Sequence, residues 1–341
     1  MRPTIYDIAR VANVSKSTVS RFLNNQKNVS LHAQERILNA IEELNYHPSK
    51  LAQSLSKGFD AILIVSRSNK TTADNPFFSE ILHSITQRAE EENFDVILQT
   101  SHDSEEELRK CTMKIREKMI KGIIMLTSPA SEEMFQQLDV FNIPVVVIGK
   151  VEGTYNNVFC VDTDNYRDSY DLTRYLISQG HEKIACMHSP FDYNVAIDRF
   201  SGYADCMADH ELRPHEDWIV NSGYASDEAY MAARQLLAAS EPPTAVFATD
   251  DIKVVGAYKA FSEKGLRIPE DISIVGYTNQ HLSQFLFPAL TGIEIPVRKL
   301  GETGTELLFS KIKKNDASSQ SKVILPTGQL IRDSVSALTA T

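Results

Sequence analysis

The apolar positions at the start of the chain follow a helical period. They share one face: Ile5, Ile8, Ala9 and Ala12. A hydroxyl at Thr4 and an acid three residues later, at Asp7, form the capping pattern that satisfies free N–H groups at a helix start. We therefore expect a first helix that begins just after Thr4 and ends at a short turn over residues 13–14.

A second helix is expected from Lys16 to about Asn24, with Ser15 as its cap. Three apolar side chains can pack against the first helix: Val14, Val19 and Leu23. The outward positions are small and polar or basic: Lys16, Ser17, Ser20 and Arg21. A third helix should begin at the cap Ser30 and end before Pro48. Its expected buried stripe is Ile37, Leu38, Ile41 and Leu44.

Two short helices with a tight turn, the second one polar and basic, are typical of a helix-turn-helix. The second helix suits the major groove of DNA, where hydroxyl and basic groups meet base edges and phosphates. The same pattern is also expected of a small helical bundle whose charged face meets only solvent, because short motifs occur by chance.

From Ala61 onward, apolar residues gather in short runs separated by helical stretches. The expected strands are residues 61–65, 95–99, 122–126 and 145–149 in one series, and 159–162, 184–188, 218–222, 245–249 and 272–276 in a second. The expected helices are residues 77–92, 105–119, 132–138, 166–179, 198–209, 226–239, 253–264 and 297–313. Continuous apolar strands indicate parallel sheets buried on both faces. The fold class is therefore α/β, with two doubly wound lobes and a ligand crevice at the carboxyl ends of their strands.

Charge is distributed unevenly along the chain. Residues 1–60 contain eight Lys and Arg against five Asp and Glu, a net charge of +3. The whole chain carries −10, which leaves −13 for the remainder. A basic head on an acidic body suits DNA that is approached from one end only.

The composition indicates a globular chain without catalytic or metal chemistry. Hydrophobic residues make up 42% of it, and no apolar run is long enough to span a membrane. No signal-peptide pattern is seen, so we expect a cytoplasmic location. The four cysteines have no metal or disulfide spacing and are expected to be reduced. Phosphate loops and catalytic Ser or His motifs are also missing, so we expect no enzyme activity, cofactor or metal.

The run YDIARVANVSKSTVSRFLN and the later run ERILNAIEELNYHPSKLAQSL closely resemble the head and hinge of the lactose/galactose repressor family of bacterial transcription regulators. The resemblance implies a periplasmic-binding-protein-like core in which the chain crosses between two lobes three times. The implied parts are a helix-turn-helix head (1–47), a hinge helix and linker (48–60) and a core (61–334). Lobe one would comprise 61–161 and 296–314, and lobe two 162–290 and 320–334, with the last strands, near 322–326 and 328–334, in lobe two.

By this resemblance, residues of the head and hinge contact operator DNA: Thr4, Tyr6, Lys16, Ser17, Thr18, Ser20, Arg21, Asn24, Ser30, Ala52 and Leu55. Lys16 and Ser17 are the expected base readers. Residues 49–56 form a hinge helix that is too short to persist alone in water. Leu55 occupies the family position that wedges into the minor groove, although it also reads as an ordinary apolar linker residue.

The resemblance also implies four effector-binding residues: Phe77, Arg199, Tyr224 and Asp251. Phe77 lies in the N-P-aromatic-F loop, and Arg199 lies in the D-R-F-S-G-Y form of a motif whose Arg binds the effector. Tyr224 matches an aromatic on which effectors stack, and Asp251 matches an acid that accepts ligand hydrogen bonds. Asp250 is expected to cap the next helix. The alternatives are surface salt bridges and packed aromatics.

These features predict a homodimeric repressor of carbohydrate-utilisation genes, released from a near-palindromic operator when a small mono- or oligosaccharide binds the cleft. The turn Ile148-Gly149-Lys150 replaces the family's usual acid and is similar to the maltose/oligosaccharide-responsive branch. No tetramerising helix follows the last expected strand, so a dimer is expected. Two alternatives stay open: a family regulator co-repressed by a small ligand or a phosphorylated carrier protein, and a sugar-binding protein without a regulatory role.

Overall fold

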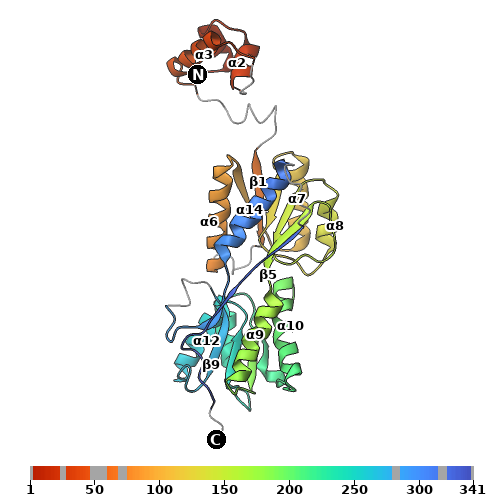
Figure 1. The fold of residues 1–341 in the computed structure, drawn as a ribbon, viewed down its shortest axis with the longest axis vertical. Helices are drawn as coiled ribbons and strands as arrows, with labels where there is room; N and C mark the ends of the chain where they lie inside the picture. The colour runs from red at the N-terminus through yellow and green to blue at the C-terminus, as the bar shows by residue number, and fades with distance from the viewer. Residues whose placement is uncertain are drawn as a thin grey trace. The chain divides into compact units, whose positions relative to one another are not determined.

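The computed structural model describes residues 3–23, 28–46, 60–67, 75–278, 285–313 and 321–338. Contacts divide the chain into two units, Met1–Phe59 and Asp60–Thr341, which are the head and the core (Figure 1). Among the described residues, no helix is both long and apolar enough to cross a membrane.

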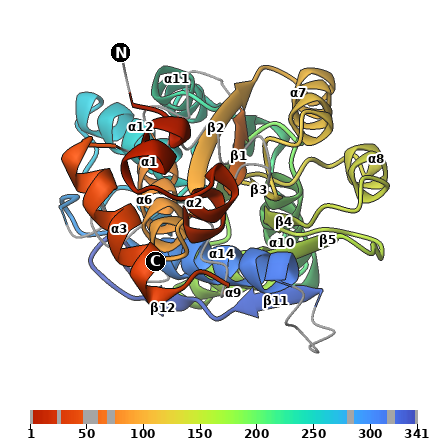
Figure 2. The ribbon, with the colours of Figure 1, turned by 90° about the horizontal axis from the view of Figure 1, so that it is seen from above.

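Helices α1 (Ile5–Val11), α2 (Lys16–Leu23) and α3 (Leu31–Glu43) form the described part of the head (Figure 2). Their caps are the expected ones. The hydroxyl of Ser15 accepts a backbone N–H of the first turn of α2 at 3.1 Å, and that of Ser30 does the same in α3 at 3.4 Å. At α1, the Thr4 N–H donates to the Asp7 carboxylate at 2.9 Å, which satisfies one of the free donors of the helix start.

A small apolar core joins the three helices. Ile8, Val19 and Ile37 are fully buried in it, one from each helix. The buried stripe of α3 is Ala33, Ile37 and Ala40. The expectation that Leu38 lies in this stripe was wrong, because its side chain is 55% exposed. One residue along a helix is a rotation of about 100°, which turns position 38 away from the core.

The first lobe of the core is a parallel sheet covered on both faces. Its strands are β1 (Ala61–Arg67), β2 (Asp95–Ser101), β3 (Gly122–Met125), β4 (Val145–Ile148), β5 (Val158–Thr163) and β11 (Lys322–Leu325), in the order β11-β5-β4-β3-β1-β2. Ile62 and Ile64 pack with α6 (Pro76–Glu91) and α14 (Val297–Lys313), whereas Leu63 and Val65 pack with α7 (Ser104–Arg116) and α8 (Glu133–Asp139). Because alternate residues enter two separate cores, the strands read as continuous apolar runs.

The second lobe repeats this plan. Its strands are β6 (Ile184–His188), β7 (Ile219–Asn221), β8 (Ala245–Ala248), β9 (Ser273–Thr278), β10 (Thr291–Glu294) and β12 (Gly328–Leu330), in the order β12-β10-β9-β8-β6-β7. The described pairs are parallel except for β10 with β12. Helices α9 (Asn165–Ser178) and α10 (Asn194–Asp209) pack on one face, and α11 (Ser226–Leu236) and α12 (Asp251–Glu263) on the other. The expected α/β fold with two doubly wound lobes is therefore confirmed.

The chain crosses between the two sheets three times, after β5, β10 and β11. Helix α14 returns to the first lobe as expected. Two other strand assignments were wrong. Strand β5, expected to open the second series, pairs with β4 in the first sheet, and β11, expected in lobe two, pairs with β5. A buried apolar run has the same sequence in either sheet, so only the pairing reveals its lobe.

The head core gives a matched pair of substitutions. Ile37→Ala should destabilise the head by roughly 2–5 kcal/mol, because it leaves a cavity where the side chain was fully buried. Leu38→Ala should change stability by less than about 0.5 kcal/mol, because that side chain is largely exposed. Hydrogen exchange of the amides of α1–α3 in the full chain measures both. Equal loss of protection in the two variants would contradict the packing described above.

Candidate effector pocket and DNA-binding face

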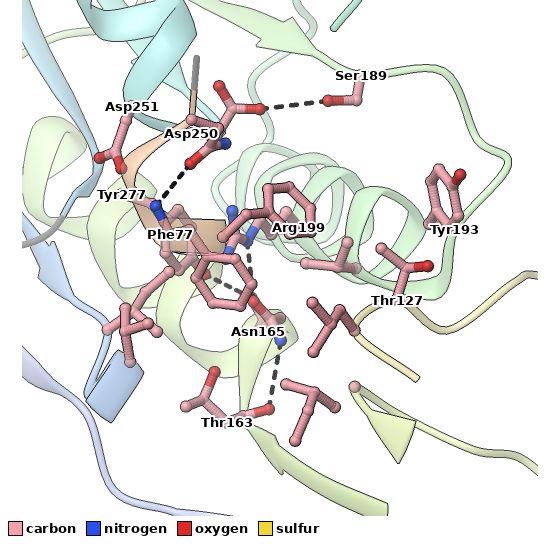
Figure 3. Close-up of a pocket in the computed structure, with 18 of the residues that line it drawn as sticks. Phe77, Thr127, Thr163, Asn165, Ser189, Tyr193, Arg199, Asp250, Asp251 and Tyr277 are labelled. Atoms are coloured by element: carbon pink, nitrogen blue, oxygen red, sulfur yellow. Dashed lines mark hydrogen bonds between the residues drawn. The ribbon is translucent and has the colours of Figure 1, made fainter. Parts of the chain in front are cut away.

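A pocket lies between the two lobes at the carboxyl ends of their strands (Figure 3). Its lining includes residues 126–128 after β3, 148–149 at β4, 162–163 at β5, 189 after β6, 224 after β7, 250–251 after β8 and 277–278 at β9. Loops at this edge of a parallel sheet are free to carry ligand contacts. The structure brings Phe77, Arg199, Tyr224 and Asp251 together around this pocket, and their roles toward a ligand stay predictions.

The two lobes line the pocket with different chemistry. Lobe one contributes most of the apolar side chains: Phe77, Phe78, Leu126, Ile148, Val297 and Leu300. Lobe two contributes most of the hydrogen-bonding side chains: Asn165, Ser189, Arg199, Asp250, Asp251 and Thr278. A ligand that fills the pocket therefore meets a wall with more apolar groups on one side and a wall with more hydrogen-bonding groups on the other.

Arg199 is fixed in the wall formed by lobe two (Figure 3). It is 8% exposed, and its Nε donates to Asn165 Oδ1 at 2.8 Å while Nη1 donates to the carbonyl of Thr249. The guanidinium lies over the Tyr277 ring, 3.6 Å from the ring centroid. These contacts fix the plane of the guanidinium, so a ligand meets a positioned fork of donors.

Gly202 explains how Arg199 reaches this place. Helix α10 packs closely on α9, and a Cβ at Gly202 would come within 2.2 Å of the Tyr166 carbonyl oxygen. Glycine permits this approach one turn after the arginine. Helix α10 begins at Asn194 and not at Asp198 as expected, which puts Arg199 inside the helix and beyond its first turn.

Asp162 is the last residue but one of β5 and lies beside this network. Its Oδ1 accepts the Thr163 N–H at 2.8 Å and Asn165 Nδ2 at 3.1 Å. Burial raises the pKa of the Asp162 carboxyl to about 6, although the Thr163 N–H and the charge of Arg199 oppose the shift. The pocket therefore contains an acid that changes its charge just below neutral pH.

Asp250 and Asp251 form the turn between β8 and α12. Asp250 caps the helix as expected, because its Oδ1 accepts the Lys253 N–H at 3.1 Å. Its Oδ2 accepts a hydrogen bond from the ammonium of Lys253. The same oxygen accepts a hydrogen bond from the hydroxyl of Ser189 (Figure 3). Burial acts to raise the pKa of the Asp250 carboxyl, but the charge and hydrogen bonds of Lys253 outweigh burial, and the pKa lies below its usual value. Asp251 is 7% exposed and lines the same part of the pocket.

Aromatic side chains from both lobes border the pocket. Asn75 caps α6 by accepting the Phe77 N–H at 2.9 Å, which sets the ring of Phe77 at the lobe-one side. In lobe two, the Tyr224 hydroxyl donates to the Asp192 carboxylate at 3.2 Å. The rings of Tyr224 and Tyr193 pack edge to face with their centroids 6.0 Å apart, and both residues line the pocket. A flat ligand can therefore contact aromatic groups of either lobe.

The two lobes touch directly at one rim of the pocket. Asn194, at the start of α10, donates from Nδ2 to the Lys150 carbonyl at 3.1 Å. The ammonium of Lys150 lies 3.1 Å from the carboxylate of Asp198. A short antiparallel bridge also joins Pro129 to Tyr193. Lys150, the residue that replaces the family's usual acid, thus pairs across the cleft, and the rim connects lobe one to residues beside the pocket.

In the head, Tyr6, Lys16, Ser17 and Arg21 are exposed. The Lys16 ammonium donates to the Tyr6 hydroxyl at 2.8 Å and lies 4.4 Å from the centroid of its ring. This contact joins α1 to the start of α2, where a recognition helix meets DNA. The other described positions of the predicted interface are Thr4 and Ser30, which are exposed, and Thr18 and Ser20, which are half-buried. Asn24, Ala52 and Leu55, with the hinge segment 49–56, lie outside the described residues.

Sequence reasoning missed three residues that line the pocket, Asp162, Asn165 and Tyr193, and it missed Lys253, which contacts the lining residue Asp250. Asp162 and Asn165 could have been found, because they stand at the carboxyl end of an expected strand. Lys253 gave no such signal, since a lysine within a helix reads as a solvated charge. Tyr193 lies in a loop whose course depends on contact between the lobes.

Comparison with known proteins extends these observations. Residues 4–49 match the bacterial regulatory proteins of the lacI family, and residues 173–335 match a periplasmic binding protein-like domain. The HTH-type transcriptional repressor PurR of Vibrio atlanticus (strain LGP32) is 33% identical over 317 residues, which are 92% of this chain and 93% of that repressor. The chain belongs to the LacI family. The resemblance seen in the head is therefore confirmed.

Solved structures agree with this family assignment. The Lac repressor dimer bound to operator and the anti-inducer ONPF superposes with a TM-score of 0.87 at 25% identity, covering 99% of this chain and 100% of that one. The CelR–cellobiose complex superposes with a TM-score of 0.72 at 26% identity, covering 98% and 100%. As a LacI-family protein, the chain is a DNA-binding transcriptional repressor with an effector-binding core, and it is not an enzyme. Repressors of this family act as dimers on operator DNA.

The acid at the pocket gives this LacI-family core a pH dependence. Because the pKa of folded Asp162 is raised to about 6, its ionisation opposes folding, with no penalty below about pH 4 and a full one above about pH 6. Asp162→Asn should therefore gain stability relative to the native chain as pH rises, by up to roughly 3 kcal/mol at pH 7.5. Urea unfolding at pH 4.5 and 7.5 measures this difference. If the difference in free energy of unfolding between the variant and the native chain is the same at both pH values, the raised pKa of Asp162 is contradicted.

Proposed function

We propose that the protein represses genes of carbohydrate use and leaves its operator when a small mono- or oligosaccharide enters the pocket between the lobes. The division of the pocket carries this proposal, because polar side chains of lobe two face apolar and aromatic side chains of lobe one. A sugar ring has hydroxyls at its edge and apolar patches on its faces, so it can satisfy both walls at once. The likeness to a CelR structure that contains cellobiose supports the same ligand class.

Each of the four effector residues has a role in this proposal. Arg199, already fixed by Asn165, donates to sugar hydroxyls, and Asp251 accepts hydrogen bonds from them. Phe77 of lobe one and Tyr224 of lobe two flank the ring. A ligand held in this way contacts both lobes, so its binding depends on how the lobes are arranged.

On the DNA side, the head of residues 1–47 reads the major groove, with Lys16 and Ser17 at base edges and Ser20 and Arg21 nearby. The hinge of residues 48–60 pairs with that of a second copy and places Leu55 in the minor groove. A homodimer with two heads requires a near-palindromic operator. Residues 1–60 have a net charge of +3 and the rest of the chain has −13. This difference supports DNA binding by the head and the hinge, and not by the core. Repression of genes places the protein with the chromosome, in the bacterial cytoplasm.

The sugar acts by favouring one arrangement of the lobes over another. The rim contacts of Asn194 and the Lys150–Asp198 ion pair join the lobes beside the pocket, so a ligand that tightens this side changes the geometry that the dimer presents to the hinges. Release follows only if the sugar binds the DNA-free arrangement more tightly than the DNA-bound one.

Fluorescence anisotropy of the full chain with a labelled near-palindromic duplex, selected from a random pool, tests the function. Binding should weaken as salt rises, because phosphate contacts release counterions. Ribose, glucose, maltose and cellobiose are then added in turn, and one of them should release the duplex. Arg199→Ala should abolish that response while leaving duplex binding intact. A sugar that strengthens binding would instead establish co-repression, and a response only to a phosphorylated carrier protein would replace the sugar.

The rim contacts give a second test. Lys150→Met should weaken binding of the releasing sugar about two- to fivefold, because it removes the partly exposed ion pair with Asp198 across the lobes, together with the pair that Lys150 forms with Glu152. Lys183→Met is the control, since its ion pair with Glu241 lies within lobe two and is more exposed than the rim pair, so its loss should leave sugar binding unchanged. Isothermal titration calorimetry compares the two variants. An equal effect of both substitutions, or none from either, would remove the rim from the mechanism.

A further inference from the structure

Lys253 carries a charge that is turned away from the pocket. It lies in the first turn of α12, and its side chain is fully buried. Its ammonium donates to Asp250 Oδ2 and to the Gly223 carbonyl at 3.2 Å. A buried ammonium without a carboxylate is strongly unfavourable, so Lys253 and Asp250 depend on each other.

Of this pair, Asp250 is the residue that lines the pocket. The side chain of Asp250 is 26% exposed to solvent, whereas that of Lys253 is 1% exposed. A ligand therefore meets the carboxylate and cannot reach the cation behind it. An ionised carboxylate only accepts hydrogen bonds, so a ligand that contacts this part of the wall must supply hydrogen-bond donors.

Lys253 also joins the loops that carry other pocket residues. Gly223 has a left-handed backbone with φ of +59° and directly precedes Tyr224 after β7. Asp250 follows β8 and accepts the hydroxyl of Ser189, which follows β6. One ammonium thus fixes the turns at the ends of three neighbouring strands of the second sheet.

The charges around the pair are mostly negative on the pocket side. Among the residues that line the pocket, the acids are Asp162, Asp250 and Asp251, and the cation is Arg199. His188, at the end of β6, has its pKa lowered by burial and stays neutral at pH 7. The positive charge of Lys253 therefore neutralises the charge of Asp250, and it is not available to neutralise the charge of an anionic ligand.

We propose that Lys253 is a specificity-determining positioning residue of the effector pocket. It holds Asp250 as an ionised carboxylate beside Asp251, so that the pocket accepts uncharged effectors with adjacent hydroxyl donors and rejects anionic ones such as sugar acids and sugar phosphates. This inference rests on the proposed sugar-binding function and adds the charge class of the effector. Like charges held a few ångströms apart in a poorly solvated pocket repel strongly, which is the physical basis of the rejection.

The first part of the test needs no ligand. Thermal unfolding of the full chain is followed at pH 5 and pH 8 for the native protein, Lys253→Met, Asp250→Asn and the double variant. Lys253→Met should lower Tm by roughly 5 °C or more at pH 8 and less at pH 5, where the unpaired Asp250 takes up a proton. The double variant, which removes both charges, should recover much of the loss. Lys259→Met, an exposed position of the same helix, is the control and should change Tm little at either pH.

The second part uses three pairs of probes in calorimetry: ribose with ribose 5-phosphate, glucose with glucose 6-phosphate, and cellobiose with cellobionate. For any pair that binds, the native protein should prefer the neutral member by more than about tenfold. The double variant has neither buried charge, and it should lose about tenfold of that preference. A purely structural role of the Lys253–Asp250 pair would lower both affinities equally and leave their ratio unchanged.

The outcomes separate this inference from the function on which it rests. Equal binding of neutral and anionic probes by the native protein, an unchanged ratio in the double variant, or no coupling between the two substitutions in unfolding would overturn the role of Lys253. Binding of none of the probes would overturn the sugar assignment alone, because the pH-dependent unfolding cycle still decides whether Lys253 holds Asp250 ionised.

Discussion

Placing charged groups in a poorly solvated cavity requires that each of them be satisfied, and this requirement shapes the second lobe. Arg199 contacts Asn165 after the first crossover, the Thr249 carbonyl before α12 and the ring of Tyr277 in β9. These groups come from distant parts of the chain. Since an unsatisfied buried guanidinium would be strongly unfavourable, the contacts also fix the crossover, the helix and the turn relative to one another.

Two carboxylates in the same pocket show how the immediate surroundings decide charge. Burial is the leading influence on both Asp162 and Asp250. Asp162 has backbone and amide donors but no ion pair within the described part of the chain, and its pKa rises to about 6. Asp250 contacts the ammonium of Lys253, and its pKa falls below the usual value. A single buried lysine thus separates an acid that can lose its charge near neutral pH from one that keeps it.

Lysines have opposite uses in the two units of the chain. In the head, Lys16 is exposed and rests on Tyr6, which keeps its charge available to phosphates and bases. In the core, Lys253 is enclosed and its charge serves only neighbouring protein groups. Lys150 is intermediate, since its ion pair with Asp198 joins the lobes at the rim. The location of each cation therefore determines whether it contacts DNA, links lobes or orients a pocket residue.

The sequence by itself determined the elements and the family. Helical and continuous apolar periods gave the head, the two strand series and the α/β class, because these patterns depend on neighbours a few residues apart. The sequence motifs around Lys16 and Arg199 indicated the repressor family, and the resemblance identified four residues that do line the pocket. Asp250 was expected as a helix cap for the same local reason.

Only the tertiary structure decided how distant segments meet. The strand periods could not show that β5 and β11 pair in the first sheet, because a buried strand looks alike in either lobe. The exposure of Leu38 depends on which side of α3 the other head helices cover. Lys253 reads as a surface charge until the fold encloses it, and the Lys150–Asp198 pair joins residues 48 apart. The pairing of distant strands and the burial of a charged side chain are set by the packing of the whole core, and no local pattern encodes them.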